Sequence, residues 1–132
     1  MVIELEKIVE IGILFDFYGM LLSKKQFLAI ELYYMNDLSI VEIGEEIDVT
    51  RQGVFDMLKR AERKLYLYEE KLKLVEKFYS SNSHVKKIKD ISEEILKDLN
   101  KDNGDCQVVL ENVKAINSIC KNILESSREV ID

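Results

Sequence analysis

The chain has 132 residues, a formal net charge of -6, and neither proline nor tryptophan. This length suits one compact domain, or a small domain with an extension. Strand-rich folds need many tight turns, which commonly use Gly and Pro, so five glycines and no proline argue against them. Abundant Leu, Ile, Glu and Lys favour an all-α protein.

Several classes of protein are also disfavoured by what the sequence lacks. It has no run of about 18 apolar residues, so no membrane insertion is predicted. The apolar start, residues 1–20, is interrupted by charges and lacks the features of a signal peptide, which indicates a cytoplasmic protein. Cys106 and Cys120 are expected to be free thiols, and His84 is the single histidine, so we predict no metal site and no cofactor. With no phosphate loop or nucleophile motif either, the sequence does not indicate an enzyme.

Two helices are predicted before residue 36. Apolar residues recur at helical spacing in the first segment and predict a helix over about residues 2–20. Ser23 with Gln26 three positions later is a capping-box pair, which predicts that a second helix begins there. Asn36 and Asp37 then favour a turn.

The next segment predicts a helix-turn-helix. Ser39 and Glu42 form another capping-box pair, and Asp48 and Thr50 limit the helix that follows to about eight residues. Thr50 is then the expected N-cap of the next helix, and two helices joined by such a short turn define the motif. Asp48 takes the place of a frequent Gly and tolerates left-handed geometry. The apolar positions expected to face the core are Leu38, Ile43, Ile47, Val49, Val54, Leu58 and Ala61.

From Arg51 the helical pattern continues for close to thirty residues, as far as the sequence "SSNS" at 80–83. We therefore predict a helix-turn-helix domain over 1–80 and a C-terminal helical extension over 81–132. The long helix carries an a/d heptad seam, for which two alternatives stay open: pairing with a second subunit in a homodimer, or packing against its own chain. The residues of this seam are Leu58, Ala61, Leu65, Tyr68, Leu72 and Val75.

The extension is expected to contain two amphipathic helices. The first is marked by Ile88, Ile91, Ile95 and Leu99. It should end at "KDNGD", residues 101–105, where Gly104 suits a left-handed C-cap. The second carries the apolar residues Val109, Val113, Ile116, Cys120 and Ile123. Both apolar faces look like core or partner-helix surface, and neither carries recognisable chemistry.

Basic charge gathers on the second helix of the motif. Residues 50–64 hold five bases and two acids, whereas residues 1–49 hold ten acids and three bases. In a helix-turn-helix the N-terminal end of the second helix enters the major groove of DNA. Arg51 and Gln52 lie at that end and could bond base edges, and the later bases, Lys64 among them, would touch phosphates. The candidate nucleic-acid-binding residues are Thr50, Arg51, Gln52, Phe55, Asp56, Lys59, Arg60 and Arg63.

The stretch "LSIVEIGEEIDVTRQGVFDMLKRAERKL", residues 38–65, resembles region 4 of bacterial sigma factors. Residues 13–78 are more closely similar to the YlxM family of small bacterial helix-turn-helix proteins, through "LFDFY", "LYY" with "DLS", "EI" with "TRQ", and "YEEKL". The resemblance implies an all-α, sigma-region-4-like bundle without a wing. It also implies a link to the signal recognition particle pathway, because genes of the family lie beside genes for that pathway. Gly44, Asp48 and Gly53 depart from the residues usual in the family.

Two functions follow as hypotheses. The first is a DNA-binding regulator that reads DNA through the helix starting at Thr50. The alternative is an accessory protein that binds the RNA or the GTPase of the signal recognition particle without reading DNA sequence. In that case Arg60, Arg63 and Lys64 would contact RNA phosphates and Phe55 would stack on a base. Gly53 removes a side chain from the surface that would read bases, which weighs against sequence-specific reading.

Overall fold

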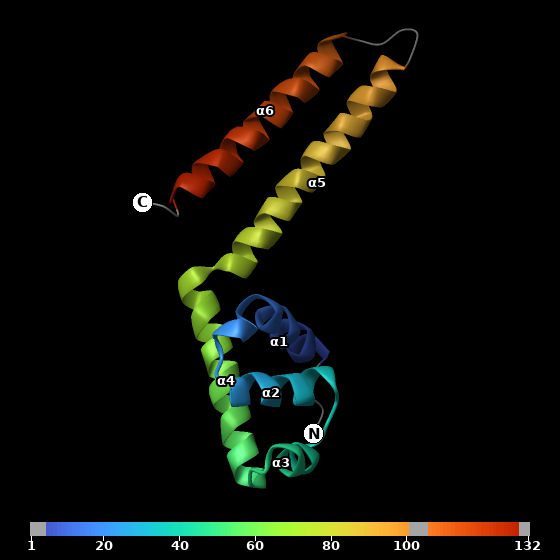
Figure 1. Cartoon of the computed structure of the whole chain (residues 1–132). Helices are drawn as coiled ribbons and strands as arrows, with labels where there is room; N and C mark the ends of the chain where they lie inside the picture. Colours follow the sequence, from blue (N-terminus) through green and yellow to red (C-terminus); the bar gives the residue numbers. More distant parts are fainter. Residues whose placement is uncertain (1–4, 101–105, 130–132) are drawn as a thin grey trace. The chain divides into compact units, whose positions relative to one another are not determined.

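The computed structural model describes residues 5–100 and 106–129, with side chains described as far as residue 125 in the last helix. Within these ranges the protein is all-α and has no strand (Figure 1). The chain divides into two compact units, unit 1 (1–75) and unit 2 (76–132). The helical segments are α1 (Leu5–Tyr18), η1 (Gly19–Leu21), α2 (Lys24–Ile30), η2 (Glu31–Met35), α3 (Ile40–Ile47), α4 (Arg51–Leu72), α5 (Leu74–Leu99) and α6 (Cys106–Glu129).

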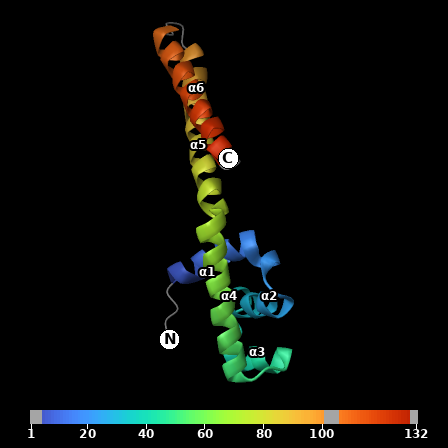
Figure 2. The same ribbon diagram turned by 90° about the vertical axis from the view of Figure 1, so that its left-hand side faces the viewer.

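Unit 1 is organised around α4. Helices α1, α2 and α3 all pack against it, and Figures 1 and 2 show α4 running along the three shorter helices. The side chains between them form one apolar core, consisting of Ile11, Leu14, Tyr18, Leu22, Ala29, Ile30, Ile43, Val54, Leu58, Ala61 and Leu65. Leu38, Ile47 and Val49 pack against this core, so the inward face predicted for the helix-turn-helix is confirmed.

Most of the predicted heptad seam of α4 lies inside this core. Leu58, Ala61 and Leu65 are buried, and Tyr68 and Val75 are partly buried against the same cluster. Leu72 is the exception, with 45% of its surface exposed. The sequence left open whether the seam pairs with a second subunit or packs within its own chain. For Leu58, Ala61 and Leu65 the structure shows packing against the chain's own helices. They are therefore not available to a second subunit while unit 1 is folded.

Side-chain caps start the helices where the sequence predicts them. Ser23 and Ser39 each accept a hydrogen bond from the backbone N–H three residues on, and Gln26 and Glu42 reach back to the cap N–H, completing both capping boxes. Thr50 likewise caps α4 by accepting from the N–H of Gly53 at 3.1 Å. These contacts satisfy N–H groups that have no partner within the helix itself.

One predicted helix boundary is wrong. The helix beginning at Arg51 does not reach "SSNS": α4 ends at Leu72, and Lys73 takes left-handed angles, φ 53° and ψ 31°. The segment "SSNS" lies inside α5 instead. Ser and Asn are weak helix breakers, whereas the end at Lys73 is fixed by contacts from elsewhere in unit 1. The hydroxyl of Tyr18 accepts from the N–H of Leu74 at 3.1 Å, and Glu69 accepts from the N–H of Val75 at 3.0 Å.

Unit 2 consists of α6 and most of α5, which lie side by side in both ribbon views and run in opposite directions (Figures 1 and 2). The predicted apolar residues Ile88, Ile91, Ile95, Val109, Ile116 and Ile123 are half-buried. No described side chain of unit 2 is fully buried. The C-cap predicted at Gly104 lies outside the described residues.

Candidate nucleic-acid interface

The turn between α3 and α4 brings the two helices of the motif close together. Asp48 ends α3 in the left-handed conformation, φ 54° and ψ 53°, as its position predicts. The N–H of Val49 then donates to the carbonyl of Gly44 at 3.0 Å. A Cβ at Gly44 would lie 2.6 Å from the carbonyl oxygen of Val49, which is too short for any contact. A side chain at position 44 would therefore require this tight turn to shift.

Gly53 also has a packing role, which differs from the role that the sequence indicates. Its Cβ would lie 2.7 Å from Cγ1 of Val49 and 3.0 Å from Oγ1 of Thr50. The missing side chain would therefore point back at the turn and not outward along a reading surface. Gly53 leaves room for the turn to pack under the first turn of α4.

The outward face of α4 carries the candidate residues. Thr50, Arg51, Gln52, Phe55, Asp56, Lys59, Arg60 and Arg63 are all exposed. The side-chain amide of Gln52 donates to Asp56 at 3.1 Å, which orders it and leaves its carbonyl oxygen as an acceptor. The ammonium of Lys59 lies 5.6 Å from the ring centre of Phe55, a cation–π contact that orders both side chains.

The arginines of this face are available to a ligand. Within the described ranges, Arg51, Arg60 and Arg63 form no ion pair with the protein's own carboxylates. Lys64 makes only a hydrogen bond to the side-chain oxygen of Gln26, at 3.2 Å. The i,i+4 pair of Asp56 with Arg60 that the sequence permits is not formed, since Asp56 faces Gln52. Unpaired guanidinium groups on one helix face are suited to phosphate oxygens.

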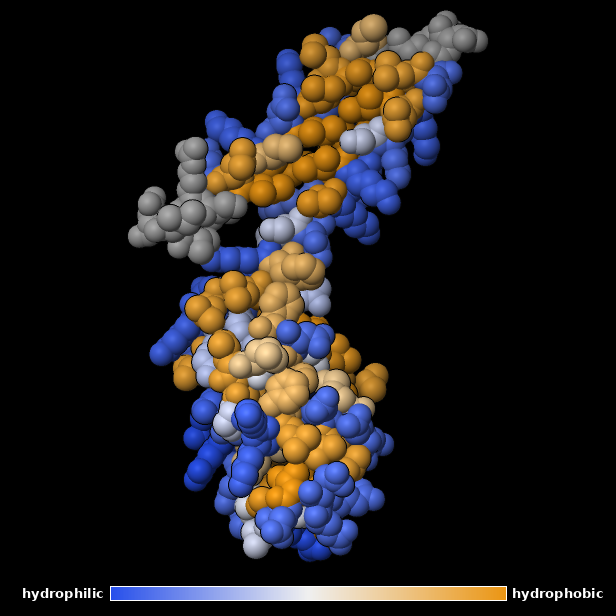
Figure 3. Space-filling model, viewed as in Figure 1, coloured by the Kyte–Doolittle hydropathy of each residue, from blue (hydrophilic) through white to orange (hydrophobic). Residues whose placement is uncertain are grey.

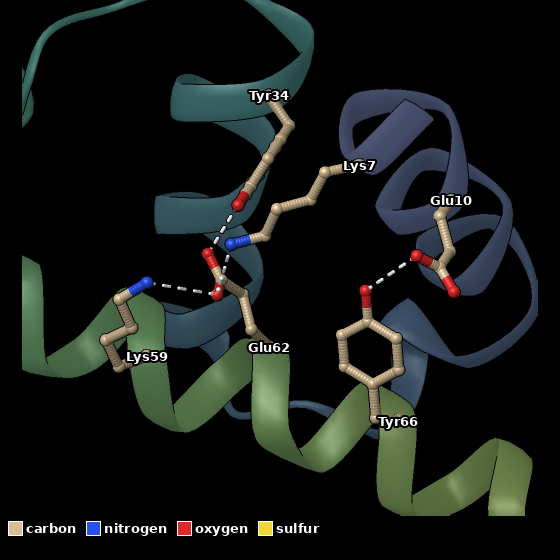
Figure 4. A network of polar contacts seen from close by, with 6 residues as sticks. All are labelled: Lys7, Glu10, Tyr34, Lys59, Glu62 and Tyr66. Atoms are coloured by element: carbon tan, nitrogen blue, oxygen red, sulfur yellow. Dashed lines mark hydrogen bonds and ion pairs between the residues drawn. The ribbon is translucent and has the colours of Figure 1, made fainter. Parts of the chain in front are cut away.

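Behind the basic face lies a buried carboxylate that the sequence did not reveal. Glu62 is only 8% exposed and accepts hydrogen bonds from the hydroxyl of Tyr34 and from Lys7, the latter at 3.3 Å (Figure 4). Lys59 lies 3.7 Å from the same carboxylate. Glu62 thus joins α1, η2 and α4 through one side chain. Its periodicity could have suggested this position, because it lies four residues after Leu58 and three before Leu65.

Burial and nearby carboxylates raise the pKa of three tyrosines in unit 1. For Tyr34, burial and then the hydrogen bond to Glu62 raise the pKa well above its ordinary value. Burial, followed by the hydrogen bond to Glu10, raises the pKa of Tyr66 to about 12 (Figure 4). The pKa of Tyr18 is raised by burial and by its hydrogen bond to Glu69. All three phenols are therefore neutral hydrogen-bond donors at ordinary pH.

The first helix of the motif carries the opposite charge. Glu42, Glu45 and Glu46 are exposed on α3, a helix that has no basic residue. The pKa of Glu42 is lowered by its hydrogen bonds with the backbone and side chain of Ser39, so this carboxylate is firmly ionised. An acidic α3 and a basic α4 therefore stand side by side in one motif.

Two short capped helices, the tight turn between them and the exposed second helix define a helix-turn-helix protein. The family described as "Putative helix-turn-helix protein, YlxM / p13 like" matches residues 5–106, and the chain belongs to this family, UPF0122. Among its relatives, a UPF0122 protein of Caldanaerobacter subterraneus is 53% identical over 78 residues, 59% of this chain and 67% of the relative. A UPF0122 protein of Bacillus cereus is 52% identical over 91 residues, 68% of this chain and 83% of the relative.

The description of the family names a helix-turn-helix and no enzymatic activity. In the described part of the chain, no group of three or more His, Cys, Asp or Glu side chains is placed to hold a metal ion. No helix within the same ranges has the length and apolar character that a membrane crossing requires.

Proposed function

We propose that this protein is a DNA-binding regulatory protein that reads duplex DNA through the N-terminal end of α4. The observation that carries the proposal is the exposed face of α4, where Arg51 and Gln52 stand at the helix start. The arginines of this face have no carboxylate partner in the part of the chain that the structure describes. This is the end of a helix-turn-helix that meets base edges in the major groove.

The roles of the residues divide along the helix. Arg51 suits a two-point contact with guanine, and the ordered side chain of Gln52 suits adenine. Thr50, held at the helix start by its bond to Gly53, would lie near a phosphate in this docking geometry while it caps the helix. Lys59, Arg60 and Arg63, about two to three turns further along, are better placed for phosphates, which position the protein without reading sequence.

The acidic residues of α3 should limit the affinity. In this docking geometry the first helix crosses the DNA backbone, so Glu45 and Glu46 would approach phosphates. We expect binding to be modest and to become tighter when these two charges are removed. Replacing both by Gln should raise affinity for any duplex about tenfold at low salt, with little change in sequence preference.

The finer part of the proposal concerns the pathway. Through the YlxM-like resemblance we place the regulatory role in the signal recognition particle pathway. The competing function, binding of that particle's RNA or GTPase through Arg60, Arg63 and Lys64, uses the same face of α4. The exposed ring of Phe55 supports this competing function, because an exposed aromatic ring beside basic side chains can stack on an unpaired nucleotide.

The experiment selects tight binders from random genomic duplexes and measures their affinity, and that of the particle's RNA, at two salt concentrations. Replacing Arg51 and Gln52 by Ala should weaken binding of the selected duplex roughly 10-fold or more and relax its sequence preference. Replacing Lys59, Arg60 and Arg63 by Ala should weaken all duplexes alike and flatten the salt dependence by about one unit of slope per lost phosphate contact.

The matched control replaces two exposed bases of unit 2, Lys86 and Lys87, by Ala and should leave duplex binding unchanged. Tight RNA or GTPase binding that ignores the Arg51 and Gln52 changes would favour the accessory function. Failure to bind any duplex at low salt would overturn the proposal of DNA binding.

A further inference from the structure

We propose that unit 2 binds the unit 2 of a second copy of this chain, so that two helical hairpins form a four-helix bundle. Unit 2 buries less apolar surface than its amphipathic helices would lead one to expect. Helices α5 and α6 are long and strongly amphipathic, yet no described side chain of unit 2 is fully buried. Two isolated helices bury little apolar surface, and helices of this kind are stabilised mainly by packing.

The half-buried residues define a heptad register. In α5, Ile88 and Ile95 occupy position a and Ile91 occupies d. In α6, the a positions are Val109, Ile116 and Ile123, and the d positions are Asn112 and Ile119. All of these are half-buried, as expected if the a/d seams of the two helices face each other. This seam alone would suffice for a two-helix pair.

Both helices also carry apolar residues outside the a/d seam, and the pairing of α5 with α6 leaves them exposed. Among the described side chains of unit 2, nine large apolar ones are exposed, and seven of them occupy positions e or b. These seven are Phe78, Val85, Leu96, Leu99, Leu110, Val113 and Leu124, between 41% and 66% exposed. Helices inside a bundle need apolar residues at a, d and one flanking position, whereas a simple coiled-coil seam needs only a and d.

The exposed apolar residues at positions e and b of the two helices lie on the same face of unit 2. In an antiparallel pair, the e positions of both helices flank the a/d seam on one side, with the b positions next to them. The e positions are uncharged on both helices, and they also include Ser92, Cys106 and Cys120. The space-filling view shows a broad apolar surface that covers both helices (Figure 3). Most charged residues lie at c, f and g, with Lys89 at b and with Lys77 and Asp98 at d near the two ends of α5.

A second copy fits this face better than a partner of different charge. A two-fold dimer brings the same patch to both sides, so an uncharged apolar strip meets its own equivalent. When α5 lies beside α6 of the second chain, Lys89 and Lys97 on the α5 rim would lie beside an α6 rim that carries Glu111 and Glu125, whereas Glu76 and Asp90 are the acidic exceptions on α5.

The size of the face is also sufficient. From Phe78 to Leu99, at about 1.5 Å per residue, it is roughly 30 Å long, and two helices side by side are roughly 20 Å wide. This is a projected area on the order of 600 Å². Stable interfaces cover about 800 Å² of accessible surface per partner, and accessible surface exceeds its projection. Four-helix bundles with such antiparallel hairpins pack at similar dimensions.

The test is sedimentation velocity of the full chain at concentrations from about 1 to 100 µM, without nucleic acid, so its outcome is independent of the proposed DNA binding. The wild type should become dimeric within this range. Val113→Glu should raise the dimer dissociation constant at least tenfold, and Val113→Ser by less. Lys114→Gln, which changes the charge equally at the next, outward-facing position, should leave it unchanged. Circular dichroism of each variant confirms that unit 1 keeps its helices.

The native thiols provide a second readout, because Cys106 and Cys120 are exposed and lie on the same face. Their alkylation by N-ethylmaleimide should slow at least tenfold as the protein becomes dimeric, and Val113→Glu should restore the fast rate. A protein that stays monomeric at all concentrations would overturn the proposal, whatever the alkylation rate of its thiols. A dimer broken by Leu72→Glu but not by Val113→Glu would also overturn it, since the interface would then lie on α4.

Discussion

The two units of this chain are built from similar helices but differ in what surrounds each helix. In unit 1, α4 is packed by three helices and a core of buried apolar residues results. In unit 2, α6 and most of α5 form a two-helix hairpin, and their best-covered described side chains are half-buried. Apolar content alone therefore does not make a core. A helix must be covered from more than one side before its residues leave water.

The largest effect that would test this difference comes from matched leucine truncations. Leu65→Ala removes a fully buried side chain of unit 1 and should lower the free energy of unfolding by about 2–5 kcal/mol. Leu96→Ala removes a side chain of unit 2 that is 60% exposed, and should change it by less than about 1 kcal/mol in dilute protein. Urea denaturation followed by circular dichroism measures both. Equal losses would mean that unit 2 has a core of its own.

A second contrast concerns carboxylates. Glu62→Ala leaves the hydroxyl of Tyr34 without its acceptor and Lys7 without its partner, which should cost about 1–3 kcal/mol of unfolding free energy. Glu62→Gln keeps one acceptor oxygen and should cost less. Glu93→Ala, at an exposed position of α5, is the matched control and should stay within about 0.5 kcal/mol of the wild type. Thermal unfolding that ranks Glu93→Ala with Glu62→Ala would contradict the structural role of this network.

Glycine substitutions near the boundary between the units should change the free energy of unfolding by smaller amounts and in opposite directions. Lys73 has left-handed angles that cost a non-glycine residue about 1 kcal/mol, so Lys73→Gly should stabilise unit 1 by up to about 1 kcal/mol. Lys71→Gly, two residues earlier in the regular helix, should destabilise it by a similar amount. Equilibrium unfolding of the two variants gives the comparison. Destabilisation by both would show that Lys73 does not hold this conformation in solution.

The smallest effect concerns alkaline pH and should be confined to unit 1. The pKa of Tyr34 is raised on folding, mainly by burial, so above pH 10 the unfolded chain loses a proton that the folded chain keeps. This contribution to stability is complete below pH 10 and falls as the pH rises further. Tyr34→Phe should therefore lose less stability than the wild type between pH 9 and pH 11. Tyr79→Phe, at an exposed position of α5, should follow the wild type in the same urea titrations.

Local signals in the sequence were sufficient for the helix-turn-helix. Ser39 and Thr50 cap helices because short polar side chains can reach the N–H three residues on, and Asp48 accepts left-handed angles for a similarly local reason. The exposed face of α4 follows from the helical period once its start is known. These features depend on neighbours within about one turn, so a single sequence contains the information.

Features that depend on distant residues could not be predicted. Lys73 ends α4 although lysine is a good helix former, because Tyr18 and Glu69 bind the N–H groups that follow it. The helical period places Glu62 between Leu58 and Leu65, but nothing near it in the sequence indicates that Tyr34 and Lys7 would surround it. Gly53 seemed to weaken a reading surface, whereas its contact with Val49 depends on the turn geometry. For Lys73 and Glu62 the missing information was the packing of α1 and η2 against α4, and for Gly53 it was the geometry of the turn before α4.

The contacts of Tyr18 and Glu69 at the start of α5 also affect how the chain unfolds. A helix usually carries its own N-cap, but α5 has its first two N–H groups bound by these two side chains, which belong to the core-forming part of unit 1. Melting of that part removes the cap and frays the first turn of α5 in the same event. Amide hydrogen exchange at Leu74 and Val75 should therefore be as slow as at the most protected sites of α4, although both residues lie at a helix end, where exchange is ordinarily fast.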